Sequence, residues 1–274
     1  MKTRVRVDGR TCATLAADDR GLLYGDGLFE TIRFVDGVAP LWPRHMQRLA
    51  HGCGRLRLPA PDCALLWREA QSATQDMASA VLRITLTRGV GQRGYAMPEA
   101  PCVTRIVAAF PMPATGVAAC RDGVRLHLCE TRLAEQPLLA GIKHLNRLEQ
   151  VLARAEWSDP AIAEGLLCDL RGNAVSATAA NLFAVIGGVP VTPRVDRCGV
   201  AGVLRAELLD VLPDVQVRDL PLAECLAASE LFLSSSVRGI LPVQAVGDTV
   251  FAPGPVTRAM QAHWRGLGFA VEQA

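Results

Sequence analysis

The stretch GLFETIRFVDGVAPLW, residues 27–42, carries two patterns that together indicate a mixed α/β domain. Its aromatic and β-branched residues predict two strands joined by a hairpin at residues 35–38, because Asp-Gly favours a tight turn. Pro43 follows directly and suits the first turn of a helix, and apolar residues recur at helical spacing between His45 and Leu56. We therefore expect two strands and then a helix in this part of the chain.

Strand and helix patterns alternate on both sides of this stretch. RVRVDGR (4–10) predicts a strand with a turn, residues 62–77 predict a second helix, and VLRITLTRG and TRIVAAF predict two more strands. Proline-containing PMPATG (111–116) is typical of a connector between domains. Further along, the patterns predict strands near residues 124–128, 165–169, 182–185 and 231–234, and helices near 146–157, 203–212 and 256–267.

Two α/β domains are therefore expected. The chain has 274 residues, of which 50% are hydrophobic, which is enough for one large core or two ordinary ones. We place the smaller domain at residues 1–112, the connector at 113–118 and the larger domain at 119–274.

The composition argues against several classes of protein. The net charge of +2 comes from both signs spread along the chain, so nucleic-acid binding is not expected. The nine cysteines form no C-x-x-C pair and the five histidines are scattered, so we expect neither disulfides nor a metal site. The first residues lack an apolar signal-peptide core, and no run reaches the roughly 20 apolar residues of a membrane span. The sequence predicts a soluble cytoplasmic protein.

Lysine is rare in this chain, and Lys143 is one of only two, because 27 of the 29 basic residues are arginine. Of the two residue types, only lysine loses its proton at accessible cost and forms an imine with an aldehyde. Asn146 and Glu149 have the spacing of a capping box, which predicts that Lys143 lies in the turn before a helix whose apolar face includes Leu148. The alternative is a leftover surface charge in an arginine-rich sequence.

Three further features are consistent with an anion near such a lysine. Arg48 lies on the helix predicted after Pro43. Two glycines precede the helix predicted at residue 203, so the amides of Val203 and Leu204 would face an anion at its N-terminus. SSSVRG (234–239) offers clustered hydroxyl groups after a strand. Each has an ordinary explanation as a basic helix face, a loop or a polar turn, but a lysine with a phosphate cradle is what pyridoxal 5′-phosphate (PLP) requires.

Four motifs in order resemble those of fold-type IV PLP enzymes, the class IV aminotransferase-like family, and within it the 4-amino-4-deoxychorismate lyase branch. These motifs are DRGLLYGDGLFETIR (19–33), RHMQRL (44–49), GIKHLNRLEQVLAR (141–154) and AANLFAV (179–185). The resemblance spans nearly the whole chain. It implies a D-amino-acid aminotransferase-like fold with a smaller α/β N-terminal domain, a larger C-terminal pseudo-barrel domain, PLP between them and a homodimer.

The resemblance also implies roles for cofactor-binding residues. Lys143 would bond covalently to PLP and serve as the general base, and Arg48 would bind the cofactor phosphate. The amides of Val203 and Leu204 and the hydroxyl of Ser236 would complete the phosphate site.

Other residues match the substrate side of the family's site. Thr31 corresponds to a threonine that faces the reaction centre and would pass a proton. Tyr24, Arg88, Arg93 and Tyr95 would line the pocket for the anionic substrate aminodeoxychorismate, which the lyase converts to 4-aminobenzoate and pyruvate for folate biosynthesis. A charged surface loop is the alternative for the two arginines.

One position departs from the family pattern. Many relatives carry a glutamate, which contacts the pyridine nitrogen of PLP, where this chain has Ala177. We expect the loss of this acid to favour the lyase reaction over transamination, and Ala177→Glu to raise transaminase activity more than lyase activity. The alternatives are a branched-chain or D-amino-acid aminotransferase of the same fold, and a PLP-binding protein without efficient turnover.

Overall fold

The computed structural model describes residues 4–11, 14–113 and 116–269. The chain divides into two compact units, and the first consists of Met1–Pro113 together with Ile142–Asn146. The second unit consists of Ala114–Gly141 and Arg147–Ala274. The short segment that contains Lys143 therefore belongs to the first unit, whereas the sequence analysis placed it in the larger domain.

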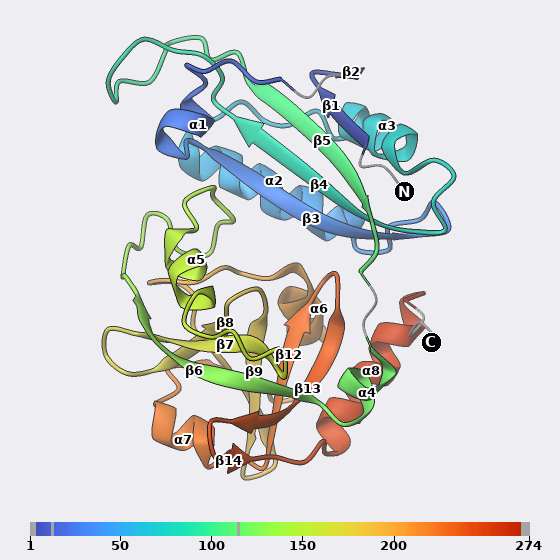
Figure 1. Ribbon diagram of the computed structural model, residues 1–274, viewed down its shortest axis with the longest axis vertical. Helices are drawn as coiled ribbons and strands as arrows, with labels where there is room; N and C mark the ends of the chain where they lie inside the picture. The colour runs from blue at the N-terminus through green and yellow to red at the C-terminus, as the bar shows by residue number, and fades with distance from the viewer. Residues whose placement is uncertain (1–3, 12–13, 114–115, 270–274) are drawn as a thin grey trace. The chain divides into compact units, whose positions relative to one another are not determined.

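The first unit is a five-stranded sheet covered on one face by two helices (Figure 1). The strand order is β2-β1-β5-β4-β3, and all pairings are antiparallel. Alternate residues of β3 are fully buried on one face, which includes Leu28, Ile32 and Phe34. The elements are β1 (Arg4–Val7), β2 (Arg10–Thr11), α1 (Arg20–Tyr24), β3 (Gly27–Val35), α2 (Trp42–Leu56), α3 (Cys63–Thr74), β4 (Ser79–Thr87) and β5 (Thr104–Pro111).

The hairpin predicted at residues 35–38 is only half right. The turn forms, with Asp36 and Gly37 at φ values of 48° and 78°, and Val35 and Val38 exchange backbone hydrogen bonds. The second strand does not form, because the chain continues directly into α2, which begins at Trp42 with a proline in its first turn. The predicted helix is confirmed, and its apolar residues Met46, Leu49 and Cys53 are buried.

The second unit is a β-barrel with helices around it (Figure 1). Within the described residues, six strands close a ring in the order β9-β12-β13-β6-β7-β8, and β8 returns to β9 through the pair Ser176 and Asn181. The strands are β6 (Val124–Leu133), β7 (Ile162–Asp169), β8 (Ala174–Ala177), β9 (Asn181–Ile186), β10 (Val189–Pro193), β11 (Gln216–Arg218), β12 (Glu230–Ser235), β13 (Gly239–Val246) and β14 (Thr249–Val250). The helices are α4 (Val117–Arg121), α5 (Leu148–Arg154), α6 (Val203–Val211), α7 (Leu222–Leu226) and α8 (Pro255–Gly266).

Helix α5 differs from the sequence-based expectation. It begins at Leu148 after Arg147, without a side-chain cap. The predicted capping box is wrong, because the Asn146 amide donates to Gly25 O and the Glu149 carboxylate accepts from Ala134 N. The apolar residues expected in a core are exposed instead, as the exposed fractions of Leu148 (74%), Val151 (60%) and Leu152 (62%) show.

The cysteines of the described residues are all free thiols, with Cys53, Cys129, Cys168, Cys198 and Cys225 buried. No helix among the described residues is both long enough and apolar enough to cross a membrane.

Ala177, the residue found in place of a glutamate, points into the barrel core. It is 3% exposed and packs in the cluster that contains Leu166, Leu182 and Leu233. Ser176 of β8 pairs with Leu167 of β7, and Leu167 belongs to a different hydrophobic cluster. The side chain of Ser176 therefore points to the face of β8 opposite that of Ala177. A carboxylate at position 177 would therefore enter an apolar core, which corrects our expectation that Ala177→Glu would act on the reaction.

We expect Ala177→Glu to lower the free energy of unfolding by about 3 kcal/mol or more, because it buries an unpaired carboxylate. Ser176→Glu is the matched control, since the same carboxylate then starts from the opposite face of the strand. Urea denaturation of both variants measures the two costs. A stability loss that is equal in both, or larger for Ser176→Glu, would contradict the assignment of the two faces.

Candidate functional site

The segment that carries Lys143 is held against the edge of β3 by backbone hydrogen bonds. Phe29 N donates to Lys143 O at 2.9 Å, and Leu145 N donates to Gly27 O at 3.0 Å. Leu28 and His144 form an antiparallel bridge between these two bonds. The backbone position of Lys143 is therefore fixed by the sheet of the first unit.

The side chain of Lys143 is partly buried and lies over an aromatic ring. Its Nζ atom is 4.3 Å from the centroid of Phe29, and the guanidinium of Arg83 is 4.1 Å from the same centroid. A cation over a ring face is attracted by the ring's quadrupole. Thr31 is two residues from Phe29 on β3 and shares its face of the sheet, so Lys143 and Thr31 lie on the same side of this strand.

Arg48 lies on α2 and binds a buried carboxylate that the sequence analysis did not select. Arg48 Nε donates to Glu30 Oε1 at 2.8 Å and Arg48 Nη2 donates to Glu30 Oε2 at 2.5 Å. His45, one turn earlier on α2, bonds to Glu30 Oε2 through Nδ1 at 2.6 Å. The signal for this cluster was present in GLFETIRF, where a carboxylate stands at an inward position among apolar residues.

The protonation states in this cluster follow from its charges. Burial raises the pKa of Glu30, but the charge and hydrogen bonds of Arg48 and then His45 more than offset this and lower it to about 2. Burial lowers the pKa of His45 below 6.5, so His45 is neutral and Glu30 ionised at neutral pH. His45 therefore donates its Nδ1 proton to Glu30 and leaves Nε2 as an acceptor, which is buried and has no hydrogen-bond partner within the described residues.

In the second unit, the start of α6 is a buried helix N-terminus without a side-chain cap. Gly202 is the cap residue, and Val203 and Leu204 are 3% and 1% exposed. A Cβ atom at Gly202 would lie 1.9 Å from Asn181 Oδ1, so any other residue here would displace the Asn181 side chain. Helix N-terminal amides need a partner when they are buried, and an anion supplies one.

Ser236 lies in the turn between β12 and β13, at the same end of β9. Asn181 begins β9, pairs with Ser234 of β12 and also packs against Gly202. Ser235 Oγ accepts from the amides of Val237 and Arg238 and so shapes this turn. The structure thus brings the N-terminus of α6 and the turn that contains Ser236 to one end of the barrel.

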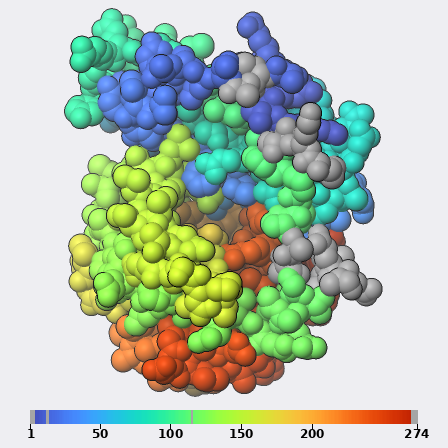
Figure 2. Space-filling model, viewed as in Figure 1, coloured from blue at the N-terminus to red at the C-terminus, as the bar shows by residue number. Residues whose placement is uncertain are grey.

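Tyr24 and Tyr95 lie next to each other in the first unit, with ring centroids 5.4 Å apart. Gly94 N donates to Tyr24 Oη at 3.3 Å, and Arg20 donates to Gly94 O at 3.0 Å, so α1 holds the loop between β4 and β5. Figure 2 shows the atoms of this loop, in teal at upper left, beside those of α1, in blue. Arg93 lies on the same loop and is exposed.

Arg88 does not share this surface position, because it is 1% exposed. Its guanidinium donates to both carboxylate oxygens of Asp26, at 2.7 and 3.0 Å. It also donates to Leu56 O at 2.7 Å and Arg57 O at 3.1 Å, at the C-terminal end of α2. Four donated hydrogen bonds inside the unit indicate a structural role, which corrects the prediction that Arg88 binds substrate.

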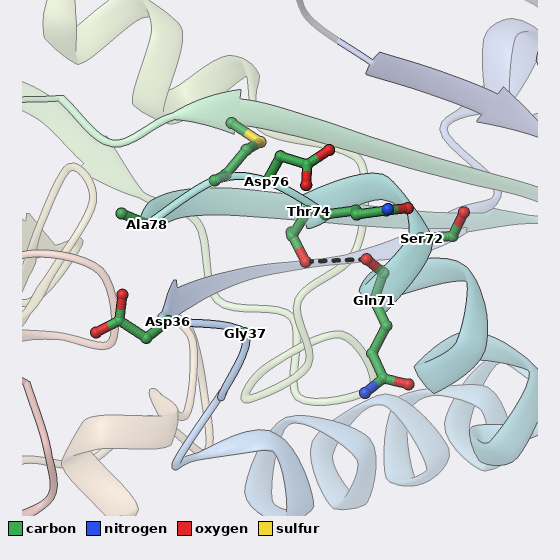
Figure 3. A pocket seen from close by; sticks show the side chains of 9 residues that line it. Asp36, Gly37, Gln71, Ser72, Thr74, Asp76 and Ala78 are labelled. Carbon is green, nitrogen blue, oxygen red and sulfur yellow. Dashed lines mark hydrogen bonds between the residues drawn. The ribbon is translucent and has the colours of Figure 1, made fainter.

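A depression on the first unit has different chemistry (Figure 3). It has a volume of about 550 Å³ and lies between the turn at Asp36 and Gly37 and the end of α3. Its lining residues include Asp36 and Asp76 but neither lysine nor arginine. Phe29 lies near the start of β3, and Asp36 directly follows its last residue. At the rise per residue of a strand, these two residues are roughly 20 Å apart. This depression is therefore separate from the residues around Lys143.

The fold is that of a class IV aminotransferase, with an α/β unit and a barrel unit. Residues 27–246 match the family model described as Amino-transferase class IV, and the chain belongs to this family. It is 37% identical to aminodeoxychorismate lyase from Vibrio harveyi, over 94% of this chain and 98% of the relative.

Two further comparisons place the chain within this family. The solved structure of 4-amino-4-deoxychorismate lyase from Pseudomonas aeruginosa is 47% identical, with a TM-score of 0.91, over 96% of this chain and 98% of that one. D-alanine aminotransferase from Listeria monocytogenes is 26% identical over 93% of this chain and 91% of the relative.

We expect Arg88→Met to lower the free energy of unfolding by about 2–4 kcal/mol, because it leaves the carbonyls of Leu56 and Arg57 without this donor. It also removes one partner of the Asp26 carboxylate, which Arg20 binds as well. Arg93→Met, the matched change on the exposed loop, should alter stability by less than about 0.5 kcal/mol. Urea denaturation tests both. If Arg88→Met is as stable as Arg93→Met, the structural assignment of Arg88 is wrong.

Acid should remove the contribution of Glu30 to stability. Because its pKa is lower in the folded protein (about 2) than the ordinary value of 4.5, this contribution is complete above pH 4.5 and is lost as the pH falls toward 2. We expect the difference in unfolding free energy between the wild type and Glu30→Gln to shrink by about 2 kcal/mol between pH 6 and pH 3. A difference that stays constant or grows over this range would contradict the ionised state.

Proposed function

We propose that this protein is a PLP-dependent lyase that converts 4-amino-4-deoxychorismate to 4-aminobenzoate and pyruvate. The observation that carries the proposal is the position of Lys143, which the backbone of β3 fixes on the same side as Thr31. Lyases of this activity from two organisms match nearly the whole chain at 37% and 47% identity, closer than the aminotransferase at 26%.

Each unit, taken by itself, contains groups suited to a phosphorylated aldehyde cofactor. The first unit supplies the Lys143 amine, the Arg48 guanidinium and the buried, unpartnered Nε2 of His45. The second supplies the uncapped amides of Val203 and Leu204 at a buried helix N-terminus. When bound, PLP supplies an aldehyde for the substrate amine and a conjugated ring that withdraws electrons from the neighbouring carbon.

We assign roles to this chain's residues accordingly. Lys143 attaches the cofactor and, once released, removes the proton from the amine-bearing carbon of the substrate. Thr31 passes a proton to the departing enolpyruvyl group as its C–O bond breaks. Arg48, the amides of Val203 and Leu204, and Ser236 bind the cofactor phosphate.

On the substrate side, Tyr24, Tyr95 and Arg93 remain our candidates for the pocket. The tyrosine rings are in contact and Arg93 is on the same loop, so its positive charge can attract a substrate with two carboxylates. Arg88 is not a candidate, because its guanidinium donates hydrogen bonds inside the unit.

The absence of a carboxylate at residues 176–178 favours this reaction over transamination. Loss of pyruvate makes the substrate ring aromatic, so the product itself lowers the demand on the cofactor as an electron sink. Transamination has no such contribution. A branched-chain or D-amino-acid aminotransferase is therefore the second candidate, and incubation with those amino acids and 2-oxoglutarate separates the two activities.

We also propose a homodimer, a cytoplasmic location and a role in folate biosynthesis, which the similarity to lyases of this activity supports. Size-exclusion chromatography with light scattering tests the dimer. Restoration of 4-aminobenzoate synthesis in cells that lack the lyase tests the pathway.

Replacing Lys143 should abolish both attachment of the cofactor and proton removal. We expect Lys143→Ala to lose more than the roughly 10²- to 10⁴-fold of general acid–base catalysis, measured as pyruvate release from aminodeoxychorismate. Borohydride reduction with PLP, followed by mass spectrometry, should give an adduct at position 143 in the wild type. Lys2→Ala, which removes the other lysine, is the control and should form the adduct normally. A Lys143→Ala protein with an adduct at native yield would contradict the proposal.

A further inference from the structure

Glu30 occupies a position where a carboxylate is costly. Its side chain is 1% exposed, and it lies on the inward face of β3 between Leu28 and Ile32, which are both 1% exposed. A buried ion pair is often no more stabilising than apolar residues of the same size, because both charges lose their water. Stability alone therefore gives little reason for a charge at this position.

The side chain of Glu30 binds two residues on one turn of α2. Its two oxygens accept from Nε and Nη2 of Arg48, and Oε2 also accepts from Nδ1 of His45 at 2.6 Å. Two hydrogen bonds in a fork fix the plane of a guanidinium, since carboxylate and guanidinium match in geometry. Glu30 thus sets the direction of the Arg48 head group from the neighbouring strand.

A fixed guanidinium binds a phosphate better than a mobile one. An arginine side chain has several rotatable bonds, and ordering them at the moment of binding lowers affinity. The buried Nε2 of His45, without a hydrogen-bond partner in the described part of the chain, is a second sign that the cluster is completed by something it binds.

We propose that Glu30 is a positioning residue, which orients Arg48 toward the phosphate of the cofactor and makes the protein prefer PLP over pyridoxal. The inference rests on the proposed function, because it takes Arg48 as a phosphate-binding residue. It adds a group that does not itself touch the cofactor. It also predicts an effect confined to ligands that carry the phosphate.

The same unit contains a matched ion pair for comparison. Arg105 of β5 donates to Glu69 of α3 through Nε at 2.6 Å and Nη2 at 2.7 Å, in the same forked arrangement. Neither residue is a candidate for the site. Glu69→Gln therefore removes a carboxylate from an equivalent pair without acting on Arg48.

The experiment measures the affinities of the cofactor-free apoprotein for PLP and for pyridoxal, which has the same aldehyde and ring but no phosphate. We expect Glu30→Gln to lower the ratio of PLP to pyridoxal affinity about tenfold or more, with pyridoxal affinity changed less than about twofold. Glu69→Gln should leave the ratio at the wild-type value. Glu30→Asp keeps the carboxylate but shortens the side chain by one methylene group, so we expect a ratio of PLP to pyridoxal affinity between those of the wild type and Glu30→Gln. If Glu30→Gln does not fold, Glu30→Asp serves as the test variant.

A wild-type ratio in both Glu30 variants would overturn the proposal, as would equal losses in Glu30→Gln and Glu69→Gln. Arg48→Ala should lower the ratio at least as far as Glu30→Gln, and the double variant should fall no further than Arg48→Ala alone. If Arg48→Ala keeps the wild-type ratio, Arg48 does not bind the phosphate and the inference is wrong. Pyruvate release from aminodeoxychorismate by the wild type, together with the borohydride adduct at Lys143, shows separately whether the proposed function stands.

Discussion

The backbone pairing between residues 142–146 and the edge of β3 is the constraint on which the candidate site depends. β3 is the last strand of its sheet, and the hydrogen bonds from Phe29 N and Leu145 N extend the sheet by one short segment. Main-chain bonds of this kind do not depend on rotamers, so they place Lys143 more reproducibly than a flexible turn would. Phe29 then directs the lysine side chain through its ring.

β3 places different chemistry on its two faces. Phe29 and Thr31 share one face of β3 and Glu30 lies on the other, because successive side chains of a strand alternate. On one face is the Lys143 amine, and on the other is the ion pair of Glu30 with Arg48 of α2. A single strand of nine residues therefore organises both a reactive amine and an anion-binding arginine. Changes in β3 that shift its register would exchange the two faces.

The sequence predicted the parts of this arrangement that depend on local patterns. The helix after Pro43 and the strands at VLRITLTRG and TRIVAAF follow from periodicity and are confirmed as α2, β4 and β5. The second arm of the hairpin at Val38 was wrong, because local turn chemistry does not tell whether the chain has room for another strand before α2. The family resemblance is confirmed by the match over residues 27–246.

Features that depend on tertiary packing were not visible in the sequence. Arg88 and Arg93 are both arginines in the same part of the sequence. Arg88 is buried between Asp26 and the end of α2, whereas Arg93 is exposed. The apolar stripe of α5 predicted a buried face, but Leu148 is 74% exposed. The inward position of Glu30 could be read from the alternation in GLFETIRF, but nothing in the sequence shows that an arginine of the next helix reaches it.

The path of the chain has a consequence for how the protein can be divided. The backbone passes between the two units three times, after Pro113, after Gly141 and after Asn146. A fragment that stops at Pro113 would contain the whole first sheet but would leave the amides and carbonyls of its last strand without a neighbour. Such a bare edge recruits other strands and promotes aggregation. The smaller unit is therefore unsuited to being inherited, or transferred to another protein, as an autonomous module.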